Sequence, residues 1–130
     1  MFSLAGTQSY RQADPRITRA IGIMEGTLSS PPSAAGLARS VGLSPSRFAH
    51  LFKTHTNSTP AAVLKRLRVA RAAELLRTTC LALKEIGAET GFEHSSAFTR
   101  AFRAASGMSP GEFRKSQRPG LAGQQESSNK

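Results

Sequence analysis

The stretch IGAETGFEHSSAFTRAFRAASGMSPGEFR, residues 86–114, repeats the plan of an earlier stretch, LARSVGLSPSRFAHLFKTHTNSTPAAVLK, residues 37–65. Helical periodicity alone explains the recurring phenylalanines, but it does not explain a glycine and a hydroxyl-proline step at matching places. We therefore interpret the two stretches as a structural repeat, although two copies are too few for a solenoid. The aligned pairs are Leu37 and Ile86, Gly42 and Gly91, Leu43 and Phe92, Phe48 and Phe98, Phe52 and Phe102, Lys53 and Arg103, Pro60 and Pro110, and Val63 and Phe113.

Outside the repeat the signals are also helical. No sustained period-2 apolar run occurs, so the predicted fold class is all-α. Asp14 followed by Pro15 is typical of an N-cap with proline at the first helical position. The helix that they open has an expected apolar stripe of Ile17, Ile21, Met24 and Leu28.

Each copy of the repeat predicts a short helix, a glycine turn and a second helix, which together make a helix-turn-helix unit. The first unit combines helices at about 34–40 and 45–55, and the second combines helices at about 82–90 and 94–105, with a last short helix after Ser109 and Pro110. Between the units, Thr59 and Pro60 open the longest helix, with an expected inward set of Val63, Leu64, Leu67, Leu75 and Leu76.

The predicted organisation follows from these elements. It consists of a flexible N-terminal segment 1–13, a first helix-turn-helix subdomain 14–58, a linker helix 59–78, a second helix-turn-helix subdomain 79–116 and a flexible tail 117–130. A linker of about twenty residues is roughly 30 Å long. Successive major grooves on one face of B-form DNA are about 34 Å apart, so one chain of this design can present two reading helices to adjacent grooves.

The charge balance indicates a polyanionic partner. Lysine and arginine number 18 against 8 acidic residues, a formal net charge of +10, which favours nucleic acid over an acidic small molecule. No carboxylate occurs between Glu25 and Glu74. That segment therefore carries a local positive field.

The remaining composition argues against other classes. A single cysteine, Cys80, excludes an internal disulfide and is expected to be a half-buried residue near a helix end. His50, His55 and His94 lack metal-ligand spacing with Cys80 or with each other, and neither a phosphate-binding glycine loop nor a paired set of carboxylates is present. The sequence predicts no catalytic residue, no metal and no cofactor. No window has the ~18 apolar residues of a membrane span, so we expect a cytoplasmic chain without a membrane partner.

With these residues the chain resembles the DNA-binding domain of the AraC/XylS family of bacterial transcription regulators. The resemblance implies seven helices, recognition helices at roughly 45–55 and 95–105, and a sequence-specific regulator, more often an activator, in the bacterial cytoplasm on the nucleoid. The chain departs from the family pattern at His50, where arginine is frequent, and at Asn57, where glycine is frequent. The matching positions are Ile86, Gly91, Phe92, Ser96, Phe98, Arg100, Phe102, Gly107, Pro110 and Arg114, with Arg68, Ala72, Leu75 and Leu76 in the linker helix.

Burial of the phenylalanines leaves a defined outward face on each recognition helix. Early residues of such a helix are best placed for base edges, and Arg100 is the strongest candidate because arginine can donate two parallel bonds to guanine O6 and N7. The predicted base-reading residues are Ser46, Arg47, Ala49, His50, Ser95, Ser96, Thr99 and Arg100. The predicted phosphate contacts are Ser44, Lys53, Arg66 and Arg103.

Other hypotheses stay open at this point. Charge alone permits a sequence-tolerant nucleic-acid-binding or architectural protein, and a single-stranded RNA binder would expose stacking aromatic residues that this pattern buries. A protein-interaction module that contacts RNA polymerase would add to double-stranded DNA binding rather than replace it. The family often places a sensing or dimerisation domain before this one, so we expect a monomer for the isolated domain and a dimer if the chain is part of a longer protein.

Overall fold

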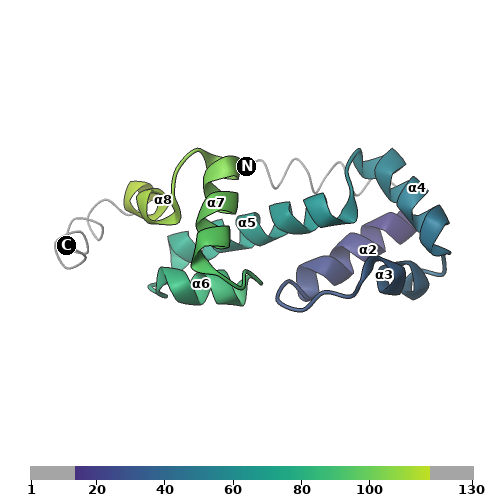
Figure 1. The fold of residues 1–130 in the computed structure, drawn as a ribbon, viewed down its shortest axis with the longest axis horizontal. Helices are drawn as coiled ribbons and strands as arrows, with labels where there is room; N and C mark the ends of the chain where they lie inside the picture. The colour runs from purple at the N-terminus through teal and green to yellow at the C-terminus, as the bar shows by residue number, and fades with distance from the viewer. Residues whose placement is uncertain (1–13, 118–130) are drawn as a thin grey trace. The chain divides into compact units, whose positions relative to one another are not determined.

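The computed structural model describes residues 14–117. Expectations about the terminal segments 1–13 and 118–130 lie outside these described residues. Helices and turns alone make up residues 14–117, which confirms the all-α prediction (Figure 1). The seven helices within them are α2 (Pro15–Gly26), α3 (Ala34–Ser40), α4 (Pro45–Thr56), α5 (Pro60–Thr78), α6 (Leu83–Glu89), α7 (Ser95–Ser106) and α8 (Pro110–Gln117).

The first helix, α2, begins as its capping residues predict. An Asp14 carboxylate oxygen accepts the Arg16 backbone N–H at 2.8 Å, and Pro15 needs no such partner because it has no N–H. Hydrogen bonds from the Arg16 side chain and backbone lower the pKa of Asp14 from 3.8 to about 2. The helix ends at Gly26, so Leu28 lies in the following turn, and its assignment to the helical stripe was wrong.

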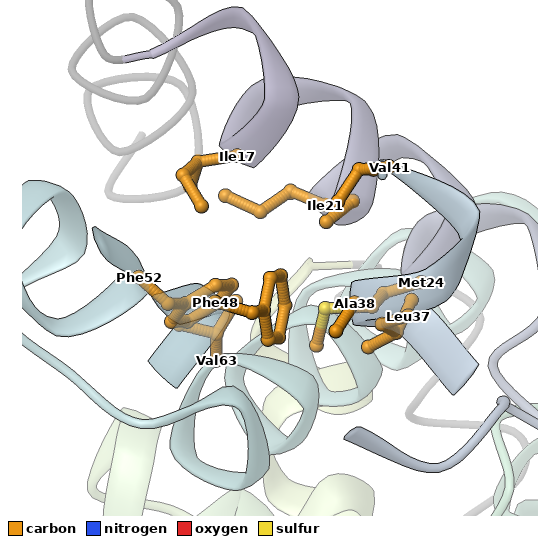
Figure 2. Packing of buried hydrophobic residues seen from close by; sticks show 10 residues of the cluster. Ile17, Ile21, Met24, Leu37, Ala38, Val41, Phe48, Phe52 and Val63 are labelled. Carbon is orange, nitrogen blue, oxygen red and sulfur yellow. The ribbon is translucent and has the colours of Figure 1, made fainter. Parts of the chain in front are cut away.

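The chain divides within α5 into two compact units, Met1–Leu67 and Arg68–Lys130. Each unit has its own hydrophobic core of described residues. In the first, α2, α3 and α4 converge on Phe48 and Phe52, whose ring centroids are 5.4 Å apart (Figure 2). The buried members are Ile17, Ala20, Ile21, Met24, Leu37, Ala38, Val41, Phe48, Phe52 and Val63.

The second core contains a run of aromatic contacts. Phe98 lies 5.4 Å from Phe92 and 6.0 Å from Phe102, and Phe102 lies 5.3 Å from Phe113, measured between ring centroids. Gly87 allows α6 to lie close to Phe98, because a Cβ atom on it would lie in a tight contact, 3.2 Å from the Phe98 ring. The buried apolar members are Val69, Ala72, Ala73, Leu75, Leu76, Ile86, Phe98 and Phe102.

Helix α5 supplies side chains to both cores. Val63 belongs to the first core, and Leu75 and Leu76 to the second, as expected; Leu64 and Leu67 are half-buried against the first. The buried Val69, Ala72 and Ala73 were absent from the expected inward set, because a helix shared by two cores does not follow one apolar stripe. Cys80, two residues after α5, is exposed rather than half-buried.

Candidate nucleic-acid interface

The turn before α4 and the turn before α7 have the same backbone hydrogen bonds. In the first unit, Gly42 N–H donates to the Arg39 carbonyl at 3.1 Å and Leu43 N–H to the Ala38 carbonyl at 2.9 Å. In the second, Gly91 N–H donates to Ala88 at 3.1 Å and Phe92 N–H to Gly87 at 2.9 Å. This pattern is the Schellman helix end. It requires a left-handed residue, and the φ angles of Gly42 and Gly91 are 76° and 98°.

The ends of α4 and α7 also match. Asn57 and Gly107 both adopt positive φ, and their N–H groups donate to the Lys53 and Arg103 carbonyls at 2.8 Å. Asparagine tolerates this left-handed conformation better than most residues with a side chain. The departure from the frequent glycine at Asn57 therefore leaves the helix end intact.

A hydroxyl group secures the chain after each of these helix ends. Thr56 Oγ1 donates to the Phe52 carbonyl at 2.7 Å and accepts the Ser58 N–H at 3.2 Å. Ser106 Oγ likewise donates to the Phe102 carbonyl at 2.8 Å and accepts the Met108 N–H at 3.3 Å. The repeat in the sequence is thus a repeat of hydrogen bonds as well as of core residues.

The two scaffolds present α4 and α7 in the same way. Phe48 and Phe52 bury one side of α4, and Phe98 and Phe102 bury one side of α7. Every predicted contact residue is exposed. These are Ser44, Ser46, Arg47, Ala49, His50, Lys53, Arg66, Ser95, Ser96, Thr99, Arg100 and Arg103.

The start of α4 differs from the start of α7. Ser44 Oγ caps α4 by accepting the Arg47 N–H at 3.2 Å, which leaves the hydroxyl hydrogen able to donate to a phosphate. At α7 the N-cap residue is His94, whose side chain makes no capping bond. Ser95 and Ser96 lie inside the helix, so the first-turn N–H groups of α7 are available to an anion.

Arg66 has a defined position on the first unit. Its Nη2 donates to Ser58 Oγ at 2.9 Å, so the guanidinium lies beside the segment that follows α4. Lys53 is in the last turn of α4. Both cations belong to the carboxylate-free span between Glu25 and Glu74.

Two arginines have roles that sequence reasoning missed. The buried Arg114 of α8 donates from Nε to the Leu76 carbonyl at 3.5 Å and from Nη2 to the Thr79 carbonyl at 3.2 Å, and thereby binds carbonyls at the end of α5. Arg68 lies over the Phe92 ring at 5.9 Å, and burial lowers the pKa of its guanidinium. Both arginines stand at positions of the family pattern, but the groups that their side chains contact depend on packing.

Other site types have little support in the described residues. Residues 14–117 contain no cluster of three or more histidine, cysteine or acidic side chains that could hold a metal ion. In the same part of the chain, no helix is long and apolar enough to cross a membrane.

Comparison with known proteins identifies the family. Residues 37–116 match the family described as "Helix-turn-helix domain". The chain is 31% identical over 108 residues to the HTH-type transcriptional regulator ArgR of Pseudomonas aeruginosa. It is also 30% identical, with a TM-score of 0.77, to the crystal structure of a transcriptional regulator with an AraC-type DNA-binding domain from Chromobacterium violaceum. The chain belongs to the AraC/XylS family.

The coverage of these matches shows which part of each relative the chain resembles. The match to ArgR includes 83% of the chain but 33% of ArgR, so the chain spans about a third of that relative's length. The match to the Chromobacterium structure includes 80% of the chain and 93% of that structure. The described units thus correspond to the AraC-type DNA-binding domain.

Another similar solved structure contains DNA. The DNA-binding domain of AdpA, described as a global transcriptional factor in complex with a target DNA, has a TM-score of 0.71 and 26% identity. The match includes 79% of this chain and 96% of the AdpA domain. The AraC/XylS relatives matched are transcription regulators, a class of protein that is not enzymatic.

Proposed function

We propose that this chain binds a specific double-stranded DNA sequence by placing α4 and α7 in successive major grooves, and that it activates transcription there. The main support is the duplicated scaffold, in which the same helix ends and core phenylalanines present two cationic reading helices. The 19 residues of α5 span about 28 Å. That length is compatible with half-sites about 34 Å apart.

The proposal includes the partners and the location. As an activator, the chain contacts RNA polymerase through residues outside the DNA interface, and it acts on the bacterial nucleoid in the cytoplasm. The isolated domain binds as a monomer, because each copy of the repeat supplies one reading helix. Within a longer protein, a further domain can make it a dimer.

In-vitro selection from random duplex DNA at physiological salt tests this function. We expect enrichment of two short motifs whose centres lie about one helical turn apart. Enrichment of a single compact motif would contradict the two-groove arrangement. Uniform retention of all sequences would instead support the sequence-tolerant alternative.

Arg100 is the residue that we expect to contribute most to recognition of the second half-site. Replacing it with alanine removes a bidentate donor to guanine, so Arg100→Ala is expected to cost about 1–3 kcal/mol at one base pair and to relax the preference there. Binding to the selected DNA and to single-base variants measures this effect. The matched variant Arg103→Ala, at a predicted phosphate contact, should weaken binding to all sequences alike. Equal losses on selected and random DNA for Arg100→Ala would reassign Arg100 to a phosphate.

Lys53 is proposed to bind a phosphate, and therefore to set affinity without reading sequence. Lys53→Gln is expected to make the plot of log K against log salt shallower by about 0.9, which corresponds to one phosphate contact. Arg71→Gln removes the same charge from a side chain whose Nη1 lies 2.8 Å from Glu74 Oε1, and it should leave a slope near that of the wild type. If both variants change the slope equally, the cause is net charge and not a contact at Lys53.

A further inference from the structure

One position of the repeated scaffold carries a histidine in one copy and an arginine in the other. His50 of α4 aligns with Arg100 of α7, since each lies two residues before a core phenylalanine, Phe52 or Phe102. Both side chains are exposed on the outward side of their helices. Arginine stays protonated at every physiological pH, whereas histidine titrates between about pH 5 and 8. The two units therefore differ in whether this position has a permanent charge.

The surroundings of His50 offer no internal partner for a proton. Its backbone carbonyl accepts the Thr54 hydroxyl at 2.8 Å, and its ring makes no hydrogen bond or ion pair with residues 14–117. The charged neighbours one turn away on α4 are Arg47 and Lys53, both cationic. The titratable groups of the helices packed against α4 come from α2, α3 and the first-unit part of α5, whose Val63 shares the core with Phe52. They are Arg16, Arg19 and Glu25 on α2, with its cap Asp14, Arg39 on α3, and Lys65 and Arg66 on α5.

Neither carboxylate of the first unit is available to His50. Asp14 already forms an ion pair with Arg16 at 2.8 Å, and the cation that adds to its electrostatic environment from α4 is His55, not His50. Glu25 lies in the last turn of α2, and the next carboxylate along the chain is Glu74. A protonated His50 thus gains a negative partner only when a polyanion approaches the outward side of α4.

We propose that His50 reads the first half-site as an imidazolium, so that the first half-site is bound through proton uptake while the second, read by Arg100, is not. This inference rests on the proposed function. Protonation gives the ring a second N–H donor and a charge beside guanine N7 and O6 or a phosphate. The negative potential of DNA favours the protonated form.

The direction of the pH effect follows from linkage. Binding takes up at most one proton, so the association constant rises as pH falls and levels off once His50 is protonated both in the free chain and in the complex. The slope of log K against pH lies between 0 and −1 for a single proton. Between pH 7.5 and 6.0 we expect an increase of about 3- to 10-fold.

Titration of binding from pH 5.5 to 8 on three duplexes tests the proposal. The duplexes carry the full selected sequence, a scrambled first half-site or a scrambled second half-site. The wild-type chain should show pH dependence on the full sequence and on the duplex with an intact first half-site. It should lose that dependence when the first half-site is scrambled.

Variants distinguish the contribution of His50 to the pH dependence of binding from that of the other histidines. His50→Arg is expected to remove the pH dependence and to keep tight binding at pH 8, whereas His50→Gln should remove it and leave weak binding. The reciprocal change Arg100→His should transfer pH dependence to the second half-site. His55→Gln and His94→Gln should keep the pH dependence that comes from the first half-site. A thermal melt of each variant from pH 5.5 to 8 checks that folding is unchanged over the range.

The outcomes for this inference and for the proposed function are distinct. A bipartite motif bound equally well at all pH values, or a slope unchanged in His50→Arg, would overturn the role of His50 and leave two-groove binding standing. Selection that yields no bipartite motif at pH 6 or pH 8 would overturn both.

Discussion

Inserting five base pairs between the two half-sites is expected to lower the affinity of the chain about 10²- to 10⁴-fold. The insertion rotates one half-site by about half a turn, so the second reading helix faces away from its groove. Simultaneous engagement through one linker multiplies two weak affinities, and that gain disappears when geometry forbids it. Titration of the spaced duplexes at constant salt measures the loss, and a duplex with one half-site sets the lower limit.

An insertion of ten base pairs tests whether one chain or two chains bind the two half-sites. It restores the facing of the half-sites but moves them about 34 Å further apart, and the 19-residue helix α5 has no means of lengthening. We therefore expect both insertions to reduce binding to the single-site level. Recovery with ten base pairs would show that two chains, or a flexible connection, bind the two half-sites.

Phe102→Ala is expected to destabilise the second unit by about 3–5 kcal/mol. The Phe102 ring is fully buried and contacts both Phe98 and Phe113, with centroids 6.0 Å and 5.3 Å away. Its removal leaves a cavity among α7, α8 and α5. The free energy of unfolding of a small domain is about 5–15 kcal/mol. The substitution therefore removes a large part of the second unit's free energy of unfolding.

Hydrogen exchange followed by mass spectrometry locates this loss. In Phe102→Ala, amide exchange should accelerate in α6, α7 and α8, while α2 and α3 stay protected. Phe52→Ala should produce the opposite pattern, since Phe52 is fully buried in the first core. The exposed Thr99→Ala, on the same helix as Phe102, should change stability by less than about 0.5 kcal/mol. Equal acceleration in all helices would mean that the two cores unfold as one cooperative unit.

Much of the fold was predictable from local sequence signals. The Asp14–Pro15 start and the glycines at 42 and 91 each act within a few residues, and the structure has the corresponding helix ends. The family assignment was predictable for the same reason, because its motif consists of turn glycines, core phenylalanines and caps at fixed spacing. The contact residues for DNA stay predictions, since exposure alone does not identify a base or a phosphate.

Errors arose where a residue's surroundings come from distant parts of the chain. The inward set of α5 missed Val69, Ala72 and Ala73 because periodicity assumes one buried stripe, whereas this helix serves two cores. Cys80 was expected to be half-buried from its type and its place near a helix end. Its exposure depends on which helices pack over that turn, and local sequence carries no such information.

The sequence by itself determined the helices, the duplicated unit, the excess positive charge and the replacement of arginine by His50. Those features depend on interactions over three or four residues or on composition, so they can be read along the chain. Only the tertiary structure decided that Arg114 binds the carbonyls of Leu76 and Thr79, and that Arg68 lies over Phe92. These contacts join residues far apart in the sequence, and their partners are defined only when packing brings separate helices together.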